Sequence, residues 1–445
     1  PDLILTKNDP KTIRAWAFYD WANSVYFLGI STVIFPIYYS SQTSGNPEMI
    51  DGVEVSMVSF LGFRFINTEL CSYILSLSFL VVAIISPFLS GIADYTGSKK
   101  KFMQFFCYLG ATGCALLFWF DPDHLEISML FILMASVGFW GSLVFYNAFL
   151  PEIAEPDLHD EVSAKGFAYG YVGSSILLII ILIVIMVLDP TDNKESTRYM
   201  FLLVAFWWAG FAQVTYRVLP SNVHDRKPDE QYIWKGYHEL KKIWKELGGL
   251  TNIKKYLRSF FVYSMGVQTV VVMAVLFSKK EIDWGNQGDA GLIISVLIIQ
   301  FVAVFGAIAF ARLSKRIGNI RVIAISLVIW AGICLYAYFI TTPTEFYTLA
   351  GIVGLVMGGI QALSRSTYSK MLPKTIDHAS YFSFYDVVEK LGIVVGTFLF
   401  GFIEGITSSM RSSAIALTIF FVLGLLLLLF VKQEGSIAPL KRKSI

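Results

Sequence analysis

Charged residues are scarce in this sequence. Asp, Glu, Lys and Arg make up 15% of its 445 residues, whereas roughly 25% is usual for a soluble domain. Hydrophobic residues supply 55%. This composition indicates an integral membrane protein surrounded by a lipid bilayer. The net charge of only +2 gives no reason to expect nucleic acid as a partner.

Cysteine is also sparse, and the motifs of catalysis are missing. The four cysteines fall in or beside apolar segments, which favours small core residues over a disulfide framework or a metal site. A zinc-protease-like fragment, HELKK at His238, lacks the second histidine, and the sequence contains neither G-x-S-x-G nor a phosphate-binding Walker loop. We therefore expect no enzyme, no nucleotide-driven pump and no cofactor.

Long apolar runs are what the sequence has in abundance. A hydrocarbon layer about 30 Å thick requires roughly 20 apolar residues in a helix. The first residues, PDLILTKNDPKTIR, lack the pattern of a cleaved signal peptide, so we expect insertion through the first spanning helix. The twelve predicted spans are 14–39, 70–93, 102–120, 127–150, 166–188, 199–218, 257–278, 291–311, 321–340, 345–369, 381–404 and 411–431.

The orientation follows from the distribution of positive charge. An even number of spans puts both termini on one side, and 27 of the 35 lysines and arginines fall in the termini and in the loops on that same side. The positive-inside rule then predicts that both termini are cytoplasmic.

The longest connection, residues 219–256, divides the chain into six spans and six spans. We predict a bundle at 1–218, a cytoplasmic linker at 219–256 and a second bundle at 257–445. Within the linker, apolar residues recur at spacings of three and four, which predicts an amphipathic helix on the inner membrane surface, with a partner-docking helix as the alternative. The apolar positions are Ile233, Tyr237, Leu240, Trp244 and Leu247.

The two halves resemble each other. IRAWAFYDWANSVYF in the first span aligns with LRSFFVYSMGVQTVV in the seventh, so that Tyr19 matches Tyr263, and Pro151 after the fourth span matches Pro373 after the tenth. Six spans separate these counterparts, so the repeat is parallel. Two bundles related by an axis along the membrane normal are expected, with a binding site between them near the midplane.

Away from the ends of the predicted spans, at membrane depth, the charged residues are Asp20, Arg365, Asp386, Glu389 and Lys390. Each costs at least about 2.5 to 3.5 kcal/mol in lipid, so each must face a partner or water. Asp386 and Lys390 are four residues apart on one helical face and are expected to pair. Asp20 either forms a permanent salt bridge with Arg365 or couples protons to transport. Glu389 is either a tie between helices or a proton carrier.

Uncharged polar and aromatic residues occur at membrane depth as well. Asn23, Ser24 and Phe27 continue a stripe from Asp20 along the first span. Amides beside aromatic walls suit a small zwitterion or polar solute, although a buried glutamine can instead bridge two helices. The further candidates for substrate contacts are Trp140, Tyr263, Gln268 and Gln300.

The loop between the second and third spans, SGIADYTGSKKK, has the form G-x-x-x-D-x-x-G-x-K-K and resembles the signature of the major facilitator superfamily. Gly91 permits close helix approach, Gly97 permits a tight turn, and Lys99 and Lys100 hold the loop in the cytosol. The resemblance implies that Asp94 caps a helix of the opposite bundle, the eleventh span, and acts in a gate; an ordinary charged turn is the alternative. The loop after the eighth span has lysine in place of this acid, so no second latch is expected there.

A fuller resemblance is to one branch of that superfamily, the unknown major facilitators related to the autophagy-related vacuolar amino-acid effluxers. It rests on YDWANSVY, YNAFLPEI, HDEVSAKGFAYGYVGS and GGIQALSRSTYSKMLP. It implies an all-α, twelve-span fold and a secondary transporter, with amino acids as substrates. We expect amino acids or short peptides to be moved by alternating access with protons as the coupling ion. Spans one, four, seven and ten line the cavity in that fold. The matching positions are Tyr19, Asp20, Trp21, Asn23, Ser24, Asn147, Pro151, Glu152, Gln361, Ser364 and Arg365.

Of these positions, Asn147 and Gln361 are added to the expected substrate contacts, and Arg365 joins Asp386 and Lys390 among the expected gate residues. We expect a monomer in a bacterial inner membrane, with a vacuolar membrane as the alternative. The rival functions are transport of sugars, nucleosides or drugs, and a receptor or scaffold that keeps the fold without turnover.

Overall fold

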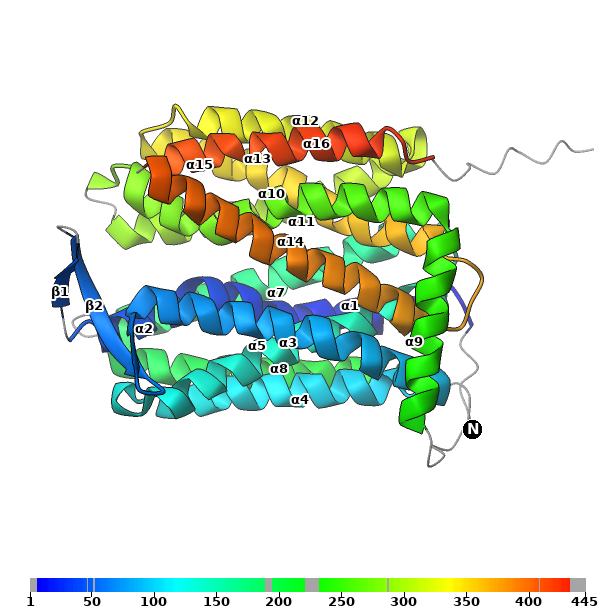
Figure 1. Ribbon diagram of the computed structural model, residues 1–445, viewed down its shortest axis with the longest axis horizontal. Coiled ribbons are helices and arrows are strands. Elements are labelled where there is room, and N and C mark those ends of the chain that lie inside the picture. The colour runs from blue at the N-terminus through cyan, green and yellow to red at the C-terminus, as the bar shows by residue number, and fades with distance from the viewer. Residues whose placement is uncertain are drawn as a thin grey trace, which may run out of the picture.

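A computed structural model describes residues 6–45, 47–50, 53–188, 194–220, 232–285, 288–407 and 409–432. Long helices run side by side along the molecule, and α9 crosses one end of them (Figure 1). We call this the α9 end. Helices α1–α8 and α10–α16 form two groups, which we call the N-terminal and C-terminal halves.

The N-terminal half contains α1 (Pro10–Val25), the π-helix η1 (Tyr26–Ile34), α2 (Phe35–Thr43), α3 (Asn67–Thr96), α4 (Lys99–Leu116), the 3-10 turns η2 (Leu117–Trp119) and η3 (Pro122–His124), α5 (Leu125–Ala148), α6 (Leu150–Ile153), α7 (His159–Leu188) and α8 (Lys194–Tyr216). After α9 (Tyr232–Gly249), the C-terminal half contains α10 (Thr251–Glu281), α11 (Gly288–Ile317), α12 (Asn319–Ala337), α13 (Pro343–Met371), α14 (His378–Thr407), α15 (Met410–Ala416) and α16 (Thr418–Leu428).

Among the described residues, 11 helical segments are long and apolar enough to cross a membrane. They correspond to all the predicted spans except 381–404. That span coincides with α14, which is 30 residues long but carries Asp386, Glu389, Lys390 and Glu404. The charges lower its hydropathy, although it lies among the other long helices (Figure 1). The helical membrane fold is confirmed, and twelve spans are consistent with it.

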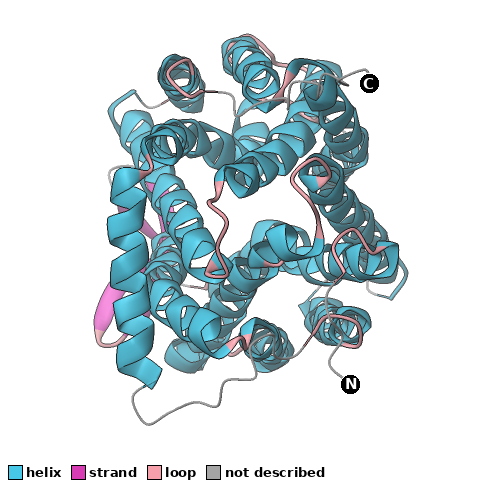
Figure 2. Cartoon of the chain, turned by 90° about the vertical axis from the view of Figure 1, so that its right-hand side faces the viewer, coloured by secondary structure: helices cyan, strands magenta, loops and turns pink. Residues whose placement is uncertain are grey.

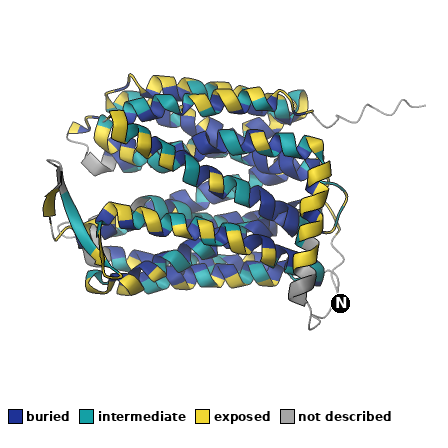
Figure 3. Ribbon diagram, viewed as in Figure 1, coloured by how far each residue is buried: buried dark blue, intermediate teal, exposed yellow. Residues whose placement is uncertain are grey.

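The outer surface of the helices is apolar. Exposed residues follow the outward faces of the bundle (Figure 3), and many are large and hydrophobic, such as Ile84, Phe206, Phe305 and Phe398. A soluble protein of this size would not expose so much apolar surface, because water penalises large contiguous patches. These faces suit the acyl chains of a bilayer.

Helix ends follow local sequence signals. Asp9 caps α1 by accepting from the backbone N–H groups of Lys11 and Thr12, and a proline occupies the first position of the helix. At the other end of its helix, Gly97 takes a φ of 70° after α3, a conformation that glycine adopts without steric cost. Signals of this kind explain why the predicted boundaries lie within a few residues of those observed.

A small antiparallel sheet follows α2 and was not predicted. Its strands β1 (Pro47–Ile50), β2 (Val53–Phe60) and β3 (Phe63–Ile66) are ordered β1-β2-β3. Leu61 and Gly62 connect β2 to β3 with φ angles of 50° and 80°, as in the two-residue turn that suits twisted hairpins. The alternation in VEVSMVSF was the available signal.

The linker helix α9 forms where the spacing predicted it. Ile243 and Leu247 are buried, because α9 packs on α3 and α14, whereas Tyr237 and Trp244 are 41% and 68% exposed. Contact of the exposed apolar residues with the membrane surface stays a prediction. The side chain of Ile233 and residues 221–231 lie outside the described part of the chain.

The halves meet through four main helix contacts. Helix α7 of the N-terminal half packs on α11 and α13, and α14 of the C-terminal half packs on α3 and α5. Figure 2 looks onto the α9 end, where α9 runs along one side of the molecule and loops of both halves approach its centre. This arrangement leaves the space between the halves as the place for a site.

Candidate functional site

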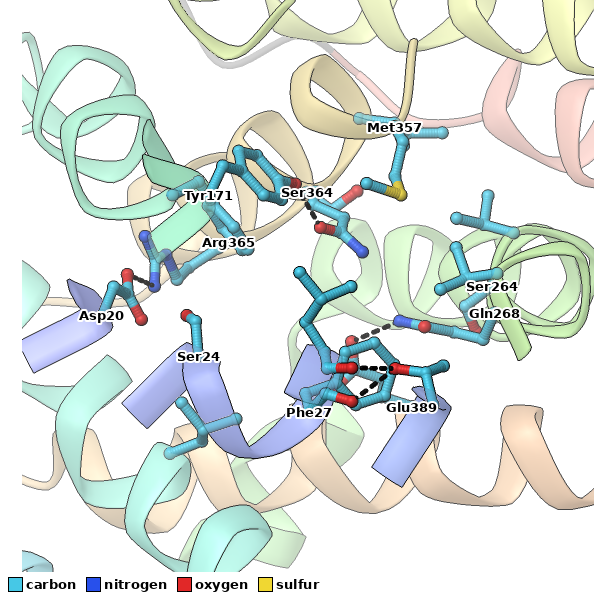
Figure 4. Close-up of a pocket in the computed structure, with 18 of the residues that line it drawn as sticks. Asp20, Ser24, Phe27, Tyr171, Ser264, Gln268, Met357, Ser364, Arg365 and Glu389 are labelled. Atoms are coloured by element: carbon cyan, nitrogen blue, oxygen red, sulfur yellow. Dashed lines mark hydrogen bonds and ion pairs between the residues drawn. The ribbon is translucent and has the colours of Figure 1, made fainter. Parts of the chain in front are cut away.

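A cavity of about 190 Å³ lies between the two halves. All nine residues predicted as substrate contacts line it: Asn23, Ser24, Phe27, Trp140, Asn147, Tyr263, Gln268, Gln300 and Gln361. Asp20, Arg365 and Glu389 also line it. In Figure 4, Asp20 and Arg365 point toward each other at one end of the cavity, and Gln268 and Glu389 lie together at the other. The role of each residue as a substrate contact stays a prediction.

A π-helix shapes one wall of this cavity. Span one changes from α-helix to η1 at Tyr26, and Phe27, Leu28 and Thr32 from η1 face the cavity. The Thr32 hydroxyl donates to the carbonyl oxygen of Leu28 at 3.1 Å. Such wider turns are rare and often occur at functional sites because they redirect side chains. No sequence signal predicted this segment.

Arg365 ties the halves together at the end of the cavity nearest α9. Its Nη1 lies 3.5 Å from Oδ2 of Asp20 and 3.1 Å from Oδ1 of Asn147. Its Nε donates to the Ser163 hydroxyl at 2.9 Å, and its Nη2 donates to the Ser163 carbonyl at 2.8 Å. The Tyr146 hydroxyl donates to Asp20 at 2.7 Å. All three guanidinium nitrogens are therefore engaged within the protein.

The guanidinium is also enclosed by aromatic rings. It lies 4.2 Å from the centre of the Phe167 ring and 4.9 Å from that of Trp16. The Arg365 side chain is only 4% exposed, so cation–π attraction and the pair with Asp20 together offset the cost of burying its charge. The sequence predicted that Asp20 must face a partner or water, and its carboxylate does face a countercharge and not lipid.

Glycines let α7 approach close enough for this contact. A Cβ on Gly166 would lie 2.6 Å from Oδ2 of Asp20 and 2.9 Å from Nη2 of Arg365. Further along α7, a Cβ on Gly170 would lie 2.4 Å from the Ser24 hydroxyl. Small residues at helix interfaces permit close approach in membranes. The segment AKGFAYGYVGS was noted only because it resembles the family, and its glycines allow α7 to pack closely against α1 and Arg365.

Gly166→Ala is expected to displace the ion pair between Asp20 and Arg365 and to lower the unfolding temperature in detergent. An added methyl that overpacks a tight site costs about 1 to 3 kcal/mol. The measurement is thermal unfolding followed by tryptophan fluorescence. The matched control is Gly210→Ala on α8, where an added Cβ would meet nothing within 4 Å. Equal unfolding temperatures for the two variants would contradict the packing argument.

The charges on α14 form a row of three. Lys390 lies 2.6 Å from Asp386 and 3.1 Å from Glu389, so the predicted pair four residues apart is present. The Lys390 ammonium also lies 4.0 Å from the Trp140 ring of the opposite half. Glu389 in turn accepts from Nε2 of Gln268 at 3.2 Å. Only Glu389 of the three charged residues lines the cavity.

At the α9 end, Asp94 caps α14 across the interface. Its Oδ1 accepts from the N–H of Ala379 at 3.1 Å and its Oδ2 accepts from the N–H of Ser380 at 2.7 Å. A carboxylate at a helix N-terminus satisfies N–H groups that otherwise lack partners and interacts favourably with the helix dipole. This is the contact that the family resemblance implied. The gating role itself stays a prediction.

Lys99 extends this contact into a buried network. It lies 3.1 Å from Asp94, pairs with Glu152 and donates to the carbonyl of Ile376 at 3.2 Å. Glu152 also meets Nδ1 of His378 at 3.1 Å. Two carboxylates, one lysine and one histidine thus join loops of both halves. From the sequence, Lys99 is predicted as a gate residue, whereas Glu152 has no predicted role and its contact with His378 is not predicted.

The three remaining residues of the signature between α3 and α4 have their described roles within the N-terminal half. The Lys100 ammonium donates to the carbonyl of Leu219 at 2.7 Å, which anchors the loop after α8. Gly97 supplies the turn between α3 and α4. Gly91 is buried in α3. These residues shape and support the loop that presents Asp94.

A second acidic contact joins the halves, although none was expected. Asp160, in the first turn of α7, accepts from the Ser314 hydroxyl at 2.7 Å, from Nδ2 of Asn319 at 2.7 Å and from Lys370 at 2.6 Å. The expectation concerned an acid in the loop after α11, and Lys315 does stand in its place. The acid stands instead on α7 of the N-terminal half, and α11, α12 and α13 supply the donors.

A second cavity, of about 570 Å³, lies among the loops at the α9 end. Lys7, Glu152, His159, Lys370 and His378 are among its lining residues. Arg365 and Asp20 belong to the lining of the central cavity and not to that of this one. The ion pair of Asp20 with Arg365 thus borders the central cavity, whereas Lys99, Glu152, Lys370 and His378 border the cavity at the α9 end.

Comparison with known proteins agrees with this geometry. A family model described as "Vacuole effluxer Atg22 like" matches residues 8–439. The chain is 32% identical to an uncharacterized MFS-type transporter, YxiO, of Bacillus subtilis, over 97% of each chain. It is 26% identical to autophagy-related protein 22-1 of Penicillium rubens, over 87% of this chain and 79% of the relative.

Solved structures share the fold at low sequence identity. The E. coli fucose:proton symporter FucP superimposes with a TM-score of 0.67 at 14% identity, covering 95% of this chain and 98% of that one. The human organic anion transporter MFSD10 superimposes with a TM-score of 0.69 at 10% identity, covering 95% of this chain and 100% of that one. At these identities the likeness concerns the fold alone.

Proposed function

This chain belongs to the Atg22-like vacuole effluxer family and is a membrane transporter of the MFS type, and from that premise we propose that it moves a small polar solute by proton-coupled alternating access. Amino acids are the substrates we favour, with short peptides next. The main support is a cavity between the halves together with a second cavity at the α9 end, each bordered by ion pairs that join the halves.

Alternating access requires contacts that close one side and can break. The hydrogen bonds of Asp94, Asp160 and Arg365 across the interface all lie between the central cavity and the α9 end. Packed interfaces of this kind have discrete arrangements and do not deform continuously. Breaking these contacts would connect the two cavities, and in the proposal this step alternates with closure on the opposite side. The α9 end is cytoplasmic in the proposal, as the positive charges predict.

The size of the cavity narrows the substrate. Drug-sized ligands occupy pockets of roughly 300 to 1,000 Å³, whereas this cavity measures about 190 Å³. A single amino acid fits such a volume better than a drug or a nucleoside. Amide groups from five helices and the rings of Phe27, Trp140 and Tyr263 supply polar contacts and apolar walls. We further propose a monomer in a bacterial inner membrane.

Proton coupling is assigned to the two carboxylates that line the cavity, Asp20 and Glu389. Intramembrane acids that face a cavity are the usual proton sites of transporters. Asp20 shares its oxygen with Arg365 and Tyr146, so a proton on Asp20 would weaken the tie between the halves. In this way protonation and opening at the α9 end are linked.

The test uses the full chain in proteoliposomes with an imposed pH gradient and radiolabelled leucine as the probe. The parent is expected to move leucine in response to the gradient, and a protonophore is expected to abolish the response. Asp20→Asn should lose gradient-driven movement, while the exposed Asp123→Asn at the opposite end should keep it. Saturable leucine binding without flux in the parent would instead indicate a receptor or scaffold.

A further inference from the structure

We propose that the central cavity selects a solute with one protonated amine on an apolar body, that Glu389 holds the ammonium, and that a proton competes for the same carboxylate. This inference rests on the proposed transport function and specifies its substrate class. It starts from the balance of charge around the cavity.

The described residues that line the cavity include one cation, Arg365, and two carboxylates, Asp20 and Glu389. Asp20 is 6% exposed and is neutralised by Arg365. Glu389 is 20% exposed and lies at the other end of the cavity (Figure 4). The surplus negative charge of the cavity therefore resides on Glu389.

Lys390 does not cancel this charge. Its ammonium lies closer to Asp386, at 2.6 Å, than to Glu389, at 3.1 Å. The Lys390 side chain is only 1% exposed and its ammonium lies over the Trp140 ring. One lysine thus serves two carboxylates, and the three charges together remain negative. A negative centre with partial access to the cavity attracts a cation.

The surroundings of Glu389 suit an ammonium. Gln268 donates to one carboxylate oxygen at 3.2 Å and so orients the group. An ammonium has three N–H donors and no acceptor, and the cavity wall offers further oxygen acceptors on amide and hydroxyl side chains. Tyr263, Ser264 and Gln300 are among the lining residues that carry such oxygens.

The rest of the wall suits an apolar body and not an anion. A solute carboxylate would need a cation, but all three guanidinium nitrogens of Arg365 are already engaged with protein oxygens, and Lys390 is buried. Aliphatic and aromatic side chains fill the remaining wall, among them Phe27, Leu28, Val267, Val271, Val296, Ile299 and Met357. The expected order of affinity is therefore cationic amine, then zwitterion, then anion.

Competition between a proton and the solute ammonium for Glu389 would let the site exchange one for the other. The charged and titratable groups around Glu389 are Lys390 and Asp386 on its own helix, and Tyr263 and Tyr385 in the cavity wall. A protonated Glu389 would carry no charge and would release the ammonium. A proton entering from one side would thus replace an amine that leaves.

The experiment compares four probes of nearly equal shape on the purified full chain in nanodiscs: leucinamide, leucine, N-acetyl-leucine and 4-methylpentanamide. Affinity is measured by titration calorimetry. Leucinamide is expected to bind at least about tenfold more tightly than 4-methylpentanamide, which lacks the ammonium, because a hydrogen bond to a charged group is worth about that factor. It is also expected to bind more tightly than leucine and N-acetyl-leucine, because their carboxylates find no free cation in the cavity. Acidification should weaken leucinamide binding.

Variants on α14 supply the controls. Glu389→Gln is expected to abolish the preference for leucinamide and its dependence on pH. Glu404→Gln removes a carboxylate from the same helix, where Glu404 pairs with Lys280 at 2.7 Å outside the cavity lining, and should retain both. Equal binding of the four probes, no binding by any of them, or a preference that survives in Glu389→Gln would overturn the inference.

Failure of this inference can be told apart from failure of the proposed function. Gradient-driven flux of leucine that persists in Glu389→Gln would keep the transport function and overturn the role of Glu389. Tight and selective binding of leucinamide without flux of any probe would keep the amine site and overturn transport. If Glu389→Gln does not fold, the order of affinity of the four probes for the parent decides the inference.

Discussion

Arg365→Gln is expected to reduce leucine flux by about two to three orders of magnitude and to lower the unfolding temperature. Removing one member of a buried ion pair costs about 3 to 5 kcal/mol, because the remaining charge stays buried without its partner. Here the charge left behind is Asp20, whose side chain is 6% exposed. In the variant, the closed arrangement of the α9 end is less stable by this free energy. The equilibrium between the closed and the open arrangement therefore shifts toward the open one.

The guanidinium cannot be replaced easily, because it holds several groups at once. It joins Asp20 and Asn147 of one face of the cavity to Ser163 on α7 and lies against the Phe167 ring. Lysine offers one compact charge without the planar fork. Arg365→Lys is therefore expected to recover thermal stability in part and flux hardly at all.

Flux in proteoliposomes and thermal unfolding in detergent are the measurements. The double variant Asp20→Asn with Arg365→Gln separates the two effects, since it removes the stranded carboxylate. We expect the double variant to unfold at a higher temperature than Arg365→Gln alone, while its flux stays low. Near-parental flux in Arg365→Gln alone would show that the ion pair between Asp20 and Arg365 has no part in the transport cycle.

Asp94→Asn is expected to open the α9 end. The carboxylate accepts two backbone N–H groups at the start of α14, at 3.1 and 2.7 Å, and lies 3.1 Å from Lys99. Hydrogen bonds to a charged group contribute about 1.5 to 3 kcal/mol. Losing that amount shifts the balance between closed and open arrangements by roughly 10- to 150-fold. The neutral amide retains acceptor capacity for only part of this network.

Distance measurement between spin labels tests this expectation. Labels at cysteines introduced in place of Lys101 and Lys374, which are exposed and belong to opposite halves, should show a longer distance population in Asp94→Asn. Asp157→Asn is the matched control, because Asp157 is an exposed acid at the same end. An unchanged distance distribution in Asp94→Asn would remove Asp94 from the gate.

Asp160 forms a second acidic contact between the halves at the α9 end. It accepts from groups on α11, α12 and α13, so both Asp94 on α3 and Asp160 on α7 accept from the C-terminal half at the α9 end. This explains how the C-terminal loop can lack the acid of the family signature. The donors Ser314 and Asn319 stand in that loop region and the carboxylate stands on α7.

Periodicity and composition were enough to predict the helices and the residues that face the cavity. Apolar runs of about 20 residues have few alternatives in a membrane, because backbone polar groups must be satisfied within the helix. A charged or amide side chain in such a run must point toward protein or water. Asp20, Gln268, Gln300 and Glu389 all line the central cavity for that reason.

The tertiary structure alone decided which groups pair with which. Glu152 meets His378 across 226 positions of sequence, and Asp160 meets Lys370 across 210. Partners so distant leave no local pattern, because their distance depends on how α7 and α14 pack against the opposite half. The same holds for Gly166, whose missing side chain makes room for Asp20 and Arg365.

The sequence by itself therefore determined that this is a helical membrane protein of the MFS type, and which side chains could not face lipid. It could not determine the sheet between α2 and α3, the inward face of α9 or the second acidic contact. Each of these depends on surfaces brought together only after folding. Burial in lipid is imposed on every residue of a span individually, whereas an ion pair requires two elements to arrive at the same place.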